Sequence, residues 1–365
     1  MKILYFIDAP QPGGATNQLY TLLKHLDKNK FTPLVAFGDF PELNPWIKSL
    51  KELNITTLKT RLTNFNKLDA VKEFKRLFKS ADPQIIHLHL CHSGSLRAAF
   101  LAARMSHAKI IATEHDPFKL NIFKKQVKRF TLRSTDHTIA VSENNRNFLT
   151  EAYGIRGSKI TRIYNGVDLE TYHPGTVSKN AVLGLDTNNF VITTAAELHP
   201  RKGINYLIKA MPKLVEKISN VKLVIVGTGK ARGDYEKLVK DMGLENKIKF
   251  LGFKENIPDI LRASNVFVLP SVREAFGLAI VEAMATKIPV VASNIGGLQE
   301  ILTKETGFML KAKDSEAIAN AILEIHDNPE FAKALTEKAF ERVKKEFSAE
   351  NMTRATEEIY KKVIN

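Results

Sequence analysis

The sequence predicts an α/β protein with two domains, each a doubly wound parallel sheet with helices on both faces. Three observations support this fold class. A chain of 365 residues is long enough for two domains. Short β-rich runs alternate with helical patterns along almost the whole chain, as in parallel sheets with helical crossovers. The alternation begins again near residue 190, after a stretch with little periodicity.

The first half contains five predicted strands, which are short apolar runs typical of strands buried on both faces. They are Lys2–Ile7, Thr32–Phe37, 85–88, 109–113 and 138–140. Between them, apolar residues recur at three- and four-residue spacing over 17–26 and 68–80, which predicts amphipathic helices.

The second half repeats this order. Its predicted strands are Phe190–Ala195, 222–226, 247–250, Val266–Leu269 and 289–292. The preceding stretch 172–189 lacks periodicity and contains Pro174, Gly175 and Gly184, so it is the predicted linker. We therefore expect domains at 1–175 and 176–345. Residues 346–365 are predicted as a C-terminal helix, for which a place in either domain stays open, including a return to the first.

Composition favours a soluble globular protein, with 44% hydrophobic and 25% charged residues. No apolar run approaches the roughly 18 residues of a membrane span. The apolar run before Asp8 is too short for a signal peptide. Cys91 is the only cysteine, which excludes an intrachain disulfide and fits a reducing compartment. The expected location is the cytoplasm.

The net charge of +15 is concentrated in the first half. Residues 1–175 contain 26 Lys and Arg against 15 Asp and Glu, whereas the remainder contains 28 against 24. Such a surface favours phosphates or anionic lipids, although solvated helix faces in a lysine-rich chain explain it equally well. No nucleic-acid-binding signature is present, so we expect no nucleic-acid partner.

The segment from Phe118 to Arg133 interleaves aromatic and basic residues. One interpretation is a basic amphipathic helix on an anionic membrane, which would make the protein peripheral on the inner face. The other is an ordinary core helix with a solvated face.

The stretch 269–300 carries the clearest chemistry. A predicted strand ends at Leu269, a loop follows, and a helix begins near Leu278 and carries Glu282. The first turn of a helix offers unpaired N–H groups and a positive dipole end, which suit a diphosphate. Glu274 and Glu282 could accept hydrogen bonds from sugar hydroxyls, or serve only as a helix cap and a surface residue. Ligands bind at such carboxyl ends of parallel strands.

This stretch resembles the Glu-x7-Glu signature of family 4 retaining glycosyltransferases of the GT-B fold. The residues that carry the resemblance are Glu274, Phe276, Gly277, Glu282, Pro289, Gly296 and Gly297. Further matches follow the family's order along nearly the whole chain: Gly13-Gly14, Thr113 to Asp116, Asn165 to Asp168, Lys202-Gly203, Gly227 with Gly229, and Leu251 to Phe253.

The resemblance implies two Rossmann-like domains that face each other across a cleft. Residues 1–175 would bind the acceptor and 176–345 the nucleotide-sugar donor. The implied activity is retaining, metal-independent hexosyl transfer to a saccharide or lipid-linked acceptor in cell-envelope glycan biosynthesis. No cofactor and no obligatory metal are expected.

The resemblance also implies residue roles. Glu282 would bind the ribose hydroxyls and Glu274 the hydroxyls of the donor sugar, while Lys202 would neutralise the diphosphate. His115 would lie beside the donor sugar, so that His115, Lys202 and Glu274 form the catalytic set. The remaining expected donor contacts are Gly13, Gly14, Arg201, Gly227, Gly252, Phe253, Phe276, Gly277 and Leu278.

One position departs from the family pattern. Glu197 stands where the family has an arginine that clamps the diphosphate, and a glutamate cannot bind phosphate. Arg201 would compensate, or would point to solvent. A non-catalytic nucleotide-sugar-binding protein and a GT-B-fold nucleotide-sugar epimerase therefore remain as alternatives.

Two other patterns are weaker. The glycines at 227, 229 and 233 resemble a dinucleotide fingerprint, but the third comes one residue late, so a turn is favoured over NAD. His87, His89 and His92 around Cys91 suggest metal ligands. Without a second cluster they are interpreted as structural histidines, with His89 or His92 bordering the acceptor site.

Overall fold

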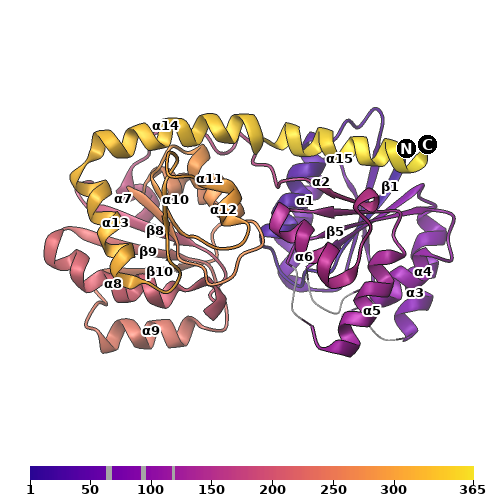
Figure 1. Cartoon of the computed structure of the whole chain (residues 1–365), viewed down its shortest axis with the longest axis horizontal. Helices are drawn as coiled ribbons and strands as arrows, with labels where there is room; N and C mark the ends of the chain where they lie inside the picture. Colours follow the sequence, from indigo (N-terminus) through magenta and orange to yellow (C-terminus); the bar gives the residue numbers. More distant parts are fainter. Residues whose placement is uncertain (63–67, 92–95, 117–119) are drawn as a thin grey trace. The chain divides into compact units, whose positions relative to one another are not determined.

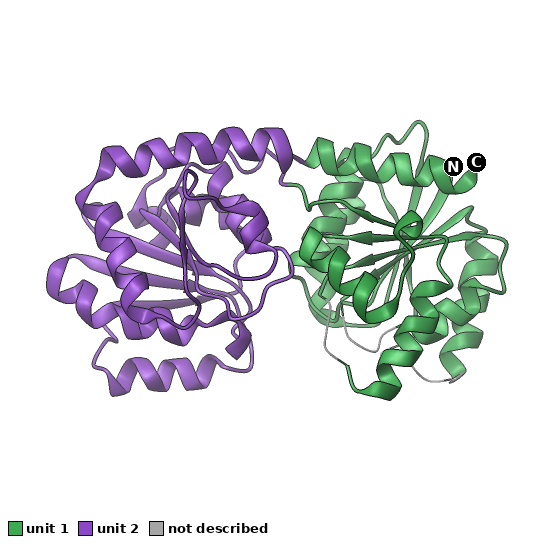
Figure 2. Ribbon diagram, viewed as in Figure 1, with its two compact units in different colours: residues 1–166, 349–365 green, residues 167–348 purple. Residues whose placement is uncertain are grey.

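The computed structural model describes residues 1–62, 68–91, 96–116 and 120–365, and the chain forms two compact units. Unit 1 contains Met1–Gly166 and Ala349–Asn365, and unit 2 contains Val167–Ser348. Figure 2 shows that the beginning and the end of the chain belong to the same unit. Each unit is a Rossmann-like domain built on a parallel sheet.

The described part of unit 1 has a seven-stranded parallel sheet in the order β3-β2-β1-β4-β5-β6-β7. Its strands are β1 (Lys2–Ile7), β2 (Thr32–Phe37), β3 (Thr56–Lys59), β4 (Ile85–Leu90), β5 (Lys109–Glu114), β6 (His137–Ala140) and β7 (Ile160–Arg162). The strand order reverses between β1 and β4, which makes this boundary the switch point of the sheet.

Helices cover both faces of this sheet (Figure 1). They are α1 (Gly14–His25), α2 (Asn44–Glu52), α3 (Leu68–Ala81), α4 (Arg97–Ala103), α5 (Ile122–Arg133), α6 (Glu143–Tyr153) and α15 (Ala349–Ile364). Leu4 and Phe6 of β1 pack into the core on one face, whereas Ile3, Tyr5 and Ile7 pack into the core on the other. Alternate residues of a strand point to opposite faces, so a strand covered on both faces is apolar throughout.

The last helix, α15, packs in unit 1 beside α1. The Gln18 side chain donates to Met352 Sδ at 3.4 Å, and the Asp27 N–H donates to Glu357 Oε1 at 2.9 Å. Tyr360 is fully buried against Tyr5 and Phe31. The C-terminal helix is therefore a core element of the first unit.

Unit 2 has a six-stranded parallel sheet in the order β10-β9-β8-β11-β12-β13. Its strands are β8 (Phe190–Ala195), β9 (Val221–Val226), β10 (Ile248–Gly252), β11 (Val266–Leu269), β12 (Val290–Ser293) and β13 (Phe308–Leu310). Its helices are α7 (Lys179–Leu183), α8 (Ile204–Lys217), α9 (Arg232–Asp241), α10 (Ile257–Arg262), α11 (Leu278–Ala285), α12 (Leu298–Ile301), α13 (Ser315–Asp327) and α14 (Pro329–Glu346).

Three strands, β3, β7 and β13, were not predicted from the sequence. All three lie at a sheet edge, where one side of the strand has no neighbour. β3 is polar at three of its four positions and only partly buried, and β7 and β13 have only three residues each, which is too short for a pattern to mark a strand.

The division between the units lies at Gly166 and Val167, nine residues before the predicted boundary at 175. The predicted linker 172–189 belongs to unit 2 and contains α7. Leu183 of α7 is buried against Val191, Val224 and Ile260. This stretch lacks periodicity because it covers the sheet with one short helix and irregular chain. In the described ranges, no helix combines the length and apolarity needed to cross a bilayer.

Candidate functional site

The strand order of unit 2 reverses between β8 and β11, so ligands are expected beyond the carboxyl ends of these strands. The loop after β8 passes through a short 3₁₀ turn, η3 (Pro200–Lys202), and the loop after β11 leads into α11. The Val272 N–H donates to the Arg201 carbonyl at 2.8 Å, and the Gly297 N–H donates to the Glu274 carbonyl at 3.3 Å. The loops that follow β8, β11 and β12 are thereby joined into one surface.

Lys202 and Glu274 form an ion pair at this edge. Lys202 Nζ lies 2.5 Å from Glu274 Oε2, and the two side chains are only 13% and 10% exposed. The Ser271 hydroxyl donates to the same carboxylate oxygen at 3.2 Å. Burial alone would raise the pKa of Glu274, but Lys202, together with Arg201 and Ser271, holds it below its usual value. Glu274 is therefore ionised at neutral pH.

Gly203 allows this approach of the two loops. Its φ is +65°, and a Cβ atom there would lie 2.0 Å from the Pro270 carbonyl oxygen. Any side chain would push the Lys202 turn away from the loop that carries Glu274.

Gly277 precedes α11 with a φ of +103°, and a Cβ atom there would lie 2.3 Å from Leu298 Cδ2. Among the described residues, no side chain caps this helix start. The first-turn N–H groups near Leu278 are thus presented at the same edge as Lys202 and Glu274, where they can bind an anion.

Glu282 lies just over one turn into α11 and is only 8% exposed. The hydroxyl of Tyr172 lies near its carboxyl group. Burial raises the pKa of Glu282 to about 7, and the nearby Tyr172 hydroxyl offsets this rise only in part. A carboxylate so placed is poorly hydrated, which prepares it to accept hydrogen bonds from a ligand.

Arg201 does not point freely to solvent. Its Nη2 atom lies 3.0 Å from Glu197 Oε2, and its charge helps to lower the pKa of Glu274. Glu197, which departs from the family pattern, is thus paired with Arg201, the residue that was expected to compensate for it. The guanidinium stays beside the site, with part of its charge neutralised.

The other predicted donor contacts of unit 2 lie further along the same edge. The Gly227 N–H donates to the Gly252 carbonyl at 2.8 Å, and the Leu198 N–H donates to Thr228 at 2.8 Å. A Cβ atom would lie 2.0 Å from the Ala196 carbonyl oxygen at Gly227 and 2.4 Å from the Leu198 carbonyl oxygen at Gly229, which accounts for these two glycines without a dinucleotide. Phe253 is 51% exposed. Phe276 is buried against Phe347, so its backbone rather than its ring is available to a ligand.

The predicted residues of unit 1 lie at the carboxyl ends of β1 and β5. Gly13 precedes α1, and its N–H donates to Thr16 Oγ1 at 2.7 Å. Nothing lies within 4 Å of a Cβ atom placed at Gly13 or Gly14. Packing within the chain therefore does not require these glycines, and close approach of a ligand remains the predicted reason for them.

Three histidines, His87, His89 and His115, lie close together in unit 1. His87 contacts Tyr360 at 2.7 Å and Thr113 at 2.8 Å, and His89 Nδ1 lies 3.0 Å from His115 Nε2. Burial lowers the pKa of His87 and of His115 to about 3, so both rings are neutral at pH 7. Within the described ranges, no three His, Cys, Asp or Glu side chains are grouped to hold a metal ion. His92 lies outside the described residues.

The segment 118–133 folds mostly as α5, although Phe118 and Lys119 lie outside the described residues. Ile122, Phe123 and Phe130 are 82%, 72% and 65% exposed. Lys128, in contrast, is buried and lies 2.6 Å from the buried Glu114. Lys128 is therefore a basic residue of this segment that faces the core, where it anchors α5 to β5.

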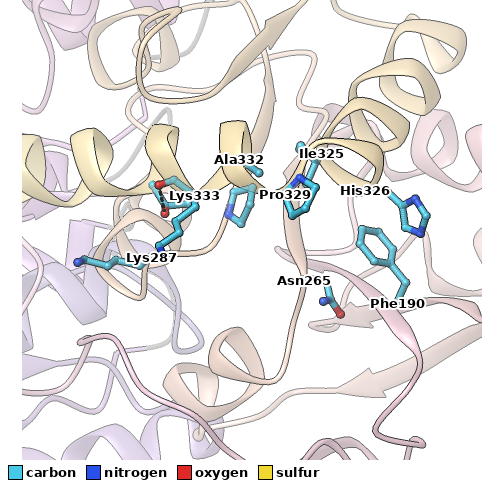
Figure 3. A pocket seen from close by; sticks show the side chains of 10 residues that line it. Phe190, Asn265, Lys287, Ile325, His326, Pro329, Ala332 and Lys333 are labelled. Carbon is cyan, nitrogen blue, oxygen red and sulfur yellow. Dashed lines mark hydrogen bonds between the residues drawn. The ribbon is translucent and has the colours of Figure 1, made fainter.

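A separate cavity of about 410 Å³ lies at the amino ends of β8, β11 and β12, opposite the edge that holds Lys202. Figure 3 shows Lys287 and Lys333 on one side of it, and Phe190 with His326 on the other. Lys287 is paired with Glu337, and none of the predicted site residues lines this cavity.

Two residues of the site were missed by sequence reasoning. Ser271 lies in the loop that was singled out, but a serine there carries no signal of its own. Tyr172 lies in the predicted linker, and only the fold brings it to Glu282.

Two family models match the chain. The model described as Glycosyl transferases group 1 matches residues 178–342, and the model described as Glycosyltransferase Family 4 matches residues 12–171. Together they cover most of both units.

Curated relatives and solved structures agree with these matches. The Escherichia coli UDP-Gal:alpha-D-GlcNAc-diphosphoundecaprenol alpha-1,3-galactosyltransferase is 30% identical over 77% of this chain and 76% of its own. The Bacillus anthracis N-acetyl-alpha-D-glucosaminyl L-malate synthase is 26% identical over 77% and 75%. The Anabaena protein HepE, crystallised with UDP and glucose, superposes with a TM-score of 0.87 at 24% identity over 99% of both chains. A glycosyltransferase of Rickettsia africae superposes with a TM-score of 0.85 at 24% identity, over 100% of this chain and 98% of its own.

Proposed function

Since the chain belongs to the family 4 glycosyltransferases of the GT-B fold, we propose that it moves a hexose from a nucleotide-diphosphate donor to a saccharide or lipid-linked acceptor, with retention of anomeric configuration. The observation that carries this proposal is the Lys202–Glu274 pair beside the start of α11, with Glu282 one turn further on. Lys202 and the N–H groups suit a diphosphate, Glu274 suits sugar hydroxyls and Glu282 suits the ribose diol.

The proposed donor is a UDP-hexose. The name of the E. coli relative specifies UDP-Gal, and that relative spans three quarters of this chain. Unit 2 would hold this donor, and unit 1 would bind the acceptor.

Lys202 and Glu274 would exchange partners when the donor binds. Without a ligand, each neutralises the other in a place with little water. With a donor, the diphosphate would take Lys202 and the sugar hydroxyls would take Glu274. Lys202 and the α11 dipole would then stabilise the charge that develops on the leaving diphosphate, a task that needs no bound metal in this proposal.

The proposed chemistry is substitution on one face of the sugar. The acceptor oxygen forms a bond to the anomeric carbon while the bond from that carbon to the phosphate oxygen breaks. The acceptor proton passes to the departing phosphate oxygen. Glu274 would be occupied by the hydroxyls of the donor sugar, which leaves it unsuited to act as a nucleophile. The neutral His115 would hold a hydroxyl of the donor sugar.

Two alternatives differ in their products. A non-catalytic nucleotide-sugar-binding protein is favoured by Glu197, which replaces a cationic clamp and neutralises part of Arg201. Such a protein would bind the donor and return it unchanged. An epimerase would convert the donor without any acceptor.

The proposed acceptor is lipid-linked, as expected in cell-envelope glycan biosynthesis, and the name of the E. coli relative specifies a diphosphoundecaprenol acceptor. The exposed Ile122, Phe123 and Phe130 of α5 lie on the same helix as the exposed Lys124 and Lys125. Apolar side chains that enter the interface and lysines that meet anionic headgroups would bind this helix to the inner face of a membrane.

A panel of nucleotides tests the proposed donor. UDP-glucose, UDP-galactose, UDP-N-acetylglucosamine, GDP-mannose and ADP-glucose are each added to the protein, and the melting temperature is recorded. A ligand at 100 times its Kd stabilises the fold by about 2.7 kcal/mol, so a UDP-hexose should raise the melting temperature most. The shift should disappear in Glu282→Ala. If none of these nucleotides raises the melting temperature, the proposed function is wrong.

A further inference from the structure

The backbone around His115 is held by three elements of unit 1. The His115 N–H donates to the Leu90 carbonyl of β4 at 3.1 Å, which continues the parallel ladder just beyond the end of β5. The preceding carbonyl, that of Glu114, accepts the side-chain N–H of Asn145 from α6 at 2.7 Å. The buried Glu114 carboxylate lies 2.6 Å from Lys128 Nζ of α5. The chain that carries the His115 ring is therefore fixed in the ligand-free protein.

The His115 ring is also held from β4. His89 Nδ1 lies 3.0 Å from His115 Nε2, and the two ring centroids are 5.2 Å apart. His89 is fully buried, and its ring centroid lies 4.4 Å from that of His87. The His87 ring is itself bonded to Tyr360 and Thr113. Close packing keeps a buried side chain of this kind in one rotamer, so His89 offers His115 a hydrogen bond of fixed direction.

The two histidines can share this bond in only two ways. Burial lowers the pKa of His115 to about 3 and the pKa of His89 well below its usual value, so both rings are neutral at pH 7. A neutral imidazole has one N–H and one lone pair. If His89 Nδ1 donates, His115 Nε2 accepts and the proton of His115 is on Nδ1. If His89 Nδ1 accepts, both rings carry their protons on Nε2.

The other nitrogen of His89 favours the first arrangement. Within the described residues, His89 Nε2 is buried and has no hydrogen-bond partner. The second arrangement would place a proton on this atom with no acceptor for it, whereas the first leaves it only as an unpaired acceptor. For backbone groups, a buried donor without an acceptor is rarer than a buried acceptor without a donor, and the same cost applies to a ring nitrogen.

We propose that His89 is a positioning residue of the site, whose Nδ1–H holds His115 in the tautomer that carries its proton on Nδ1. His115 then presents a hydrogen-bond donor, rather than a lone pair, to a hydroxyl oxygen of the donor sugar. This inference rests on the proposed function, which supplies the sugar hydroxyl as the partner of His115. It gives a role in donor binding to a buried histidine that was expected only to be structural or to border the acceptor site.

NMR of the ligand-free full chain with nitrogen-15-labelled histidine tests the tautomer directly. Two-bond nitrogen–proton correlations separate a protonated ring nitrogen from an unprotonated one, and His115→Ala identifies the His115 signals. The expected result at pH 7 is a single neutral tautomer of His115 with its proton on Nδ1. In His89→Phe, the signals should move toward the mixture of tautomers that a solvated imidazole shows. His89→Asn, whose amide can replace Nδ1, should restore the single tautomer.

Calorimetric titration with UDP-glucose and with UDP tests the role in binding. His89→Phe should weaken UDP-glucose binding about fivefold, the effect of one hydrogen bond. It should leave UDP affinity within twofold of wild type, because UDP lacks the transferred sugar. In a His115→Ala background, the same change should alter UDP-glucose affinity less than twofold, since the ring that His89 positions is gone. His89→Asn should bind UDP-glucose nearly as wild type does.

His137→Gln is the matched control. His137 is a buried histidine on β6 of the same sheet, and its Nε2 lies 2.9 Å from Thr161 Oγ1. A glutamine amide can replace that nitrogen, so the fold should be retained. This variant should keep the His115 signals and the UDP-glucose affinity of wild type.

The inference is overturned by a wild-type His115 that carries its proton on Nε2, a result that does not depend on whether His89→Phe folds. It is also overturned if His89→Phe leaves the His115 signals unchanged. Equal losses of UDP and UDP-glucose affinity in His89→Phe would show that His89 supports the fold and not the sugar contact. A wild-type chain that binds neither ligand contradicts the proposed donor instead, and the spectra of the ligand-free chain still confirm or overturn the tautomer.

Discussion

Lys202 is more than a solvent-exposed lysine of a binding site, because it is the counterion of a nearly buried carboxylate. Removing one partner of such a pair leaves the other charge without compensation. The expected loss of folding stability is about 3 kcal/mol, the lower end of the range for buried pairs. A variant at Lys202 is therefore expected to lose stability as well as turnover. The two effects have to be measured separately.

Glu282 places an ionisable group where its charged form is disfavoured. The native carboxyl keeps its proton up to about pH 7, whereas the usual value is 4.5. The folded state thus binds the extra proton between these values, and the free energy of unfolding falls as pH rises from about 4.5 to 7. Above pH 7 the full cost of the buried charge is present.

Glu282→Gln should therefore stabilise the protein at pH 8 by roughly 2 kcal/mol and have little effect at pH 5. Urea midpoints of wild type and variant at the two pH values measure this difference. Glu324→Gln, at an exposed position on α13, is the control and should show no pH-dependent gain. An equal effect of Glu282→Gln at both pH values would mean that Glu282 is not a buried ionisable group. The same variant should bind UDP-glucose less tightly, as expected where a binding residue reduces stability.

At the residue scale, the sequence could predict Lys202, Glu274 and Glu282 because each follows a recognisable strand or loop. It could not predict their partners. Tyr172 comes near Glu282 only through the fold, because it lies in a turn that has no periodic pattern. The pairing of Glu197 with Arg201 depends on rotamers and not on spacing alone.

At the element scale, α5 has opposite faces with different functions. Lys128 is buried against Glu114 and connects the helix to the strand that ends just before His115. Ile122, Phe123 and Phe130 are exposed, which is unusual for such large apolar side chains. The aromatic-basic pattern was visible in the sequence. The sequence did not show which lysine faces the core, because the pairing of a lysine with a buried glutamate on another element leaves no local pattern.

Replacing Lys124 and Lys125 by Gln should weaken binding to phosphatidylglycerol vesicles by more than tenfold, because each lysine near an anionic surface contributes about 1 kcal/mol. Raising the ionic strength should reduce wild-type binding steeply but leave some residual binding, because salt does not screen the apolar contribution. Phe123→Ser should remove this residual binding. Cosedimentation measures both effects.

The matched control for this change replaces the exposed Lys237 and Lys240 of α9 by Gln, which removes the same charge from unit 2. Vesicle binding of this variant should remain close to that of wild type. Equal binding of wild type to phosphatidylcholine and phosphatidylglycerol vesicles would rule out the lipid surface as the partner of α5.

Central and edge strands differed in how well the sequence predicted them. β1, β2, β8 and β11 are mostly buried and rich in apolar and β-branched residues, and their predicted bounds match the structure. β3, β7 and β13 are edge strands whose pairing with one neighbour, rather than their own composition, makes them strands. Local pattern therefore predicts the centre of a sheet better than its edges.

At the scale of the whole molecule, the two-domain α/β architecture could be predicted because strand and helix patterns alternate twice. The assignment of α15 to unit 1 could not be predicted from the sequence. An amphipathic helix presents an apolar stripe that suits any uncovered face, and only tertiary packing, such as that of Tyr360 on His87 and Tyr5, selects one.

The measurement that tests the central claim most directly follows a labelled sugar. The protein is incubated with UDP-hexose labelled in the sugar, with and without a polyprenyl-diphosphate-linked sugar, and the label and released UDP are quantified. The predicted result is label in the acceptor fraction with an equal amount of UDP, only when acceptor is present. Lys202→Ala should lower this rate at least about 100-fold at a temperature where the variant remains folded, whereas the exposed-lysine control Lys209→Ala should keep it. Donor that is bound and recovered unchanged, or converted to an isomeric UDP-hexose without acceptor, would contradict the claim.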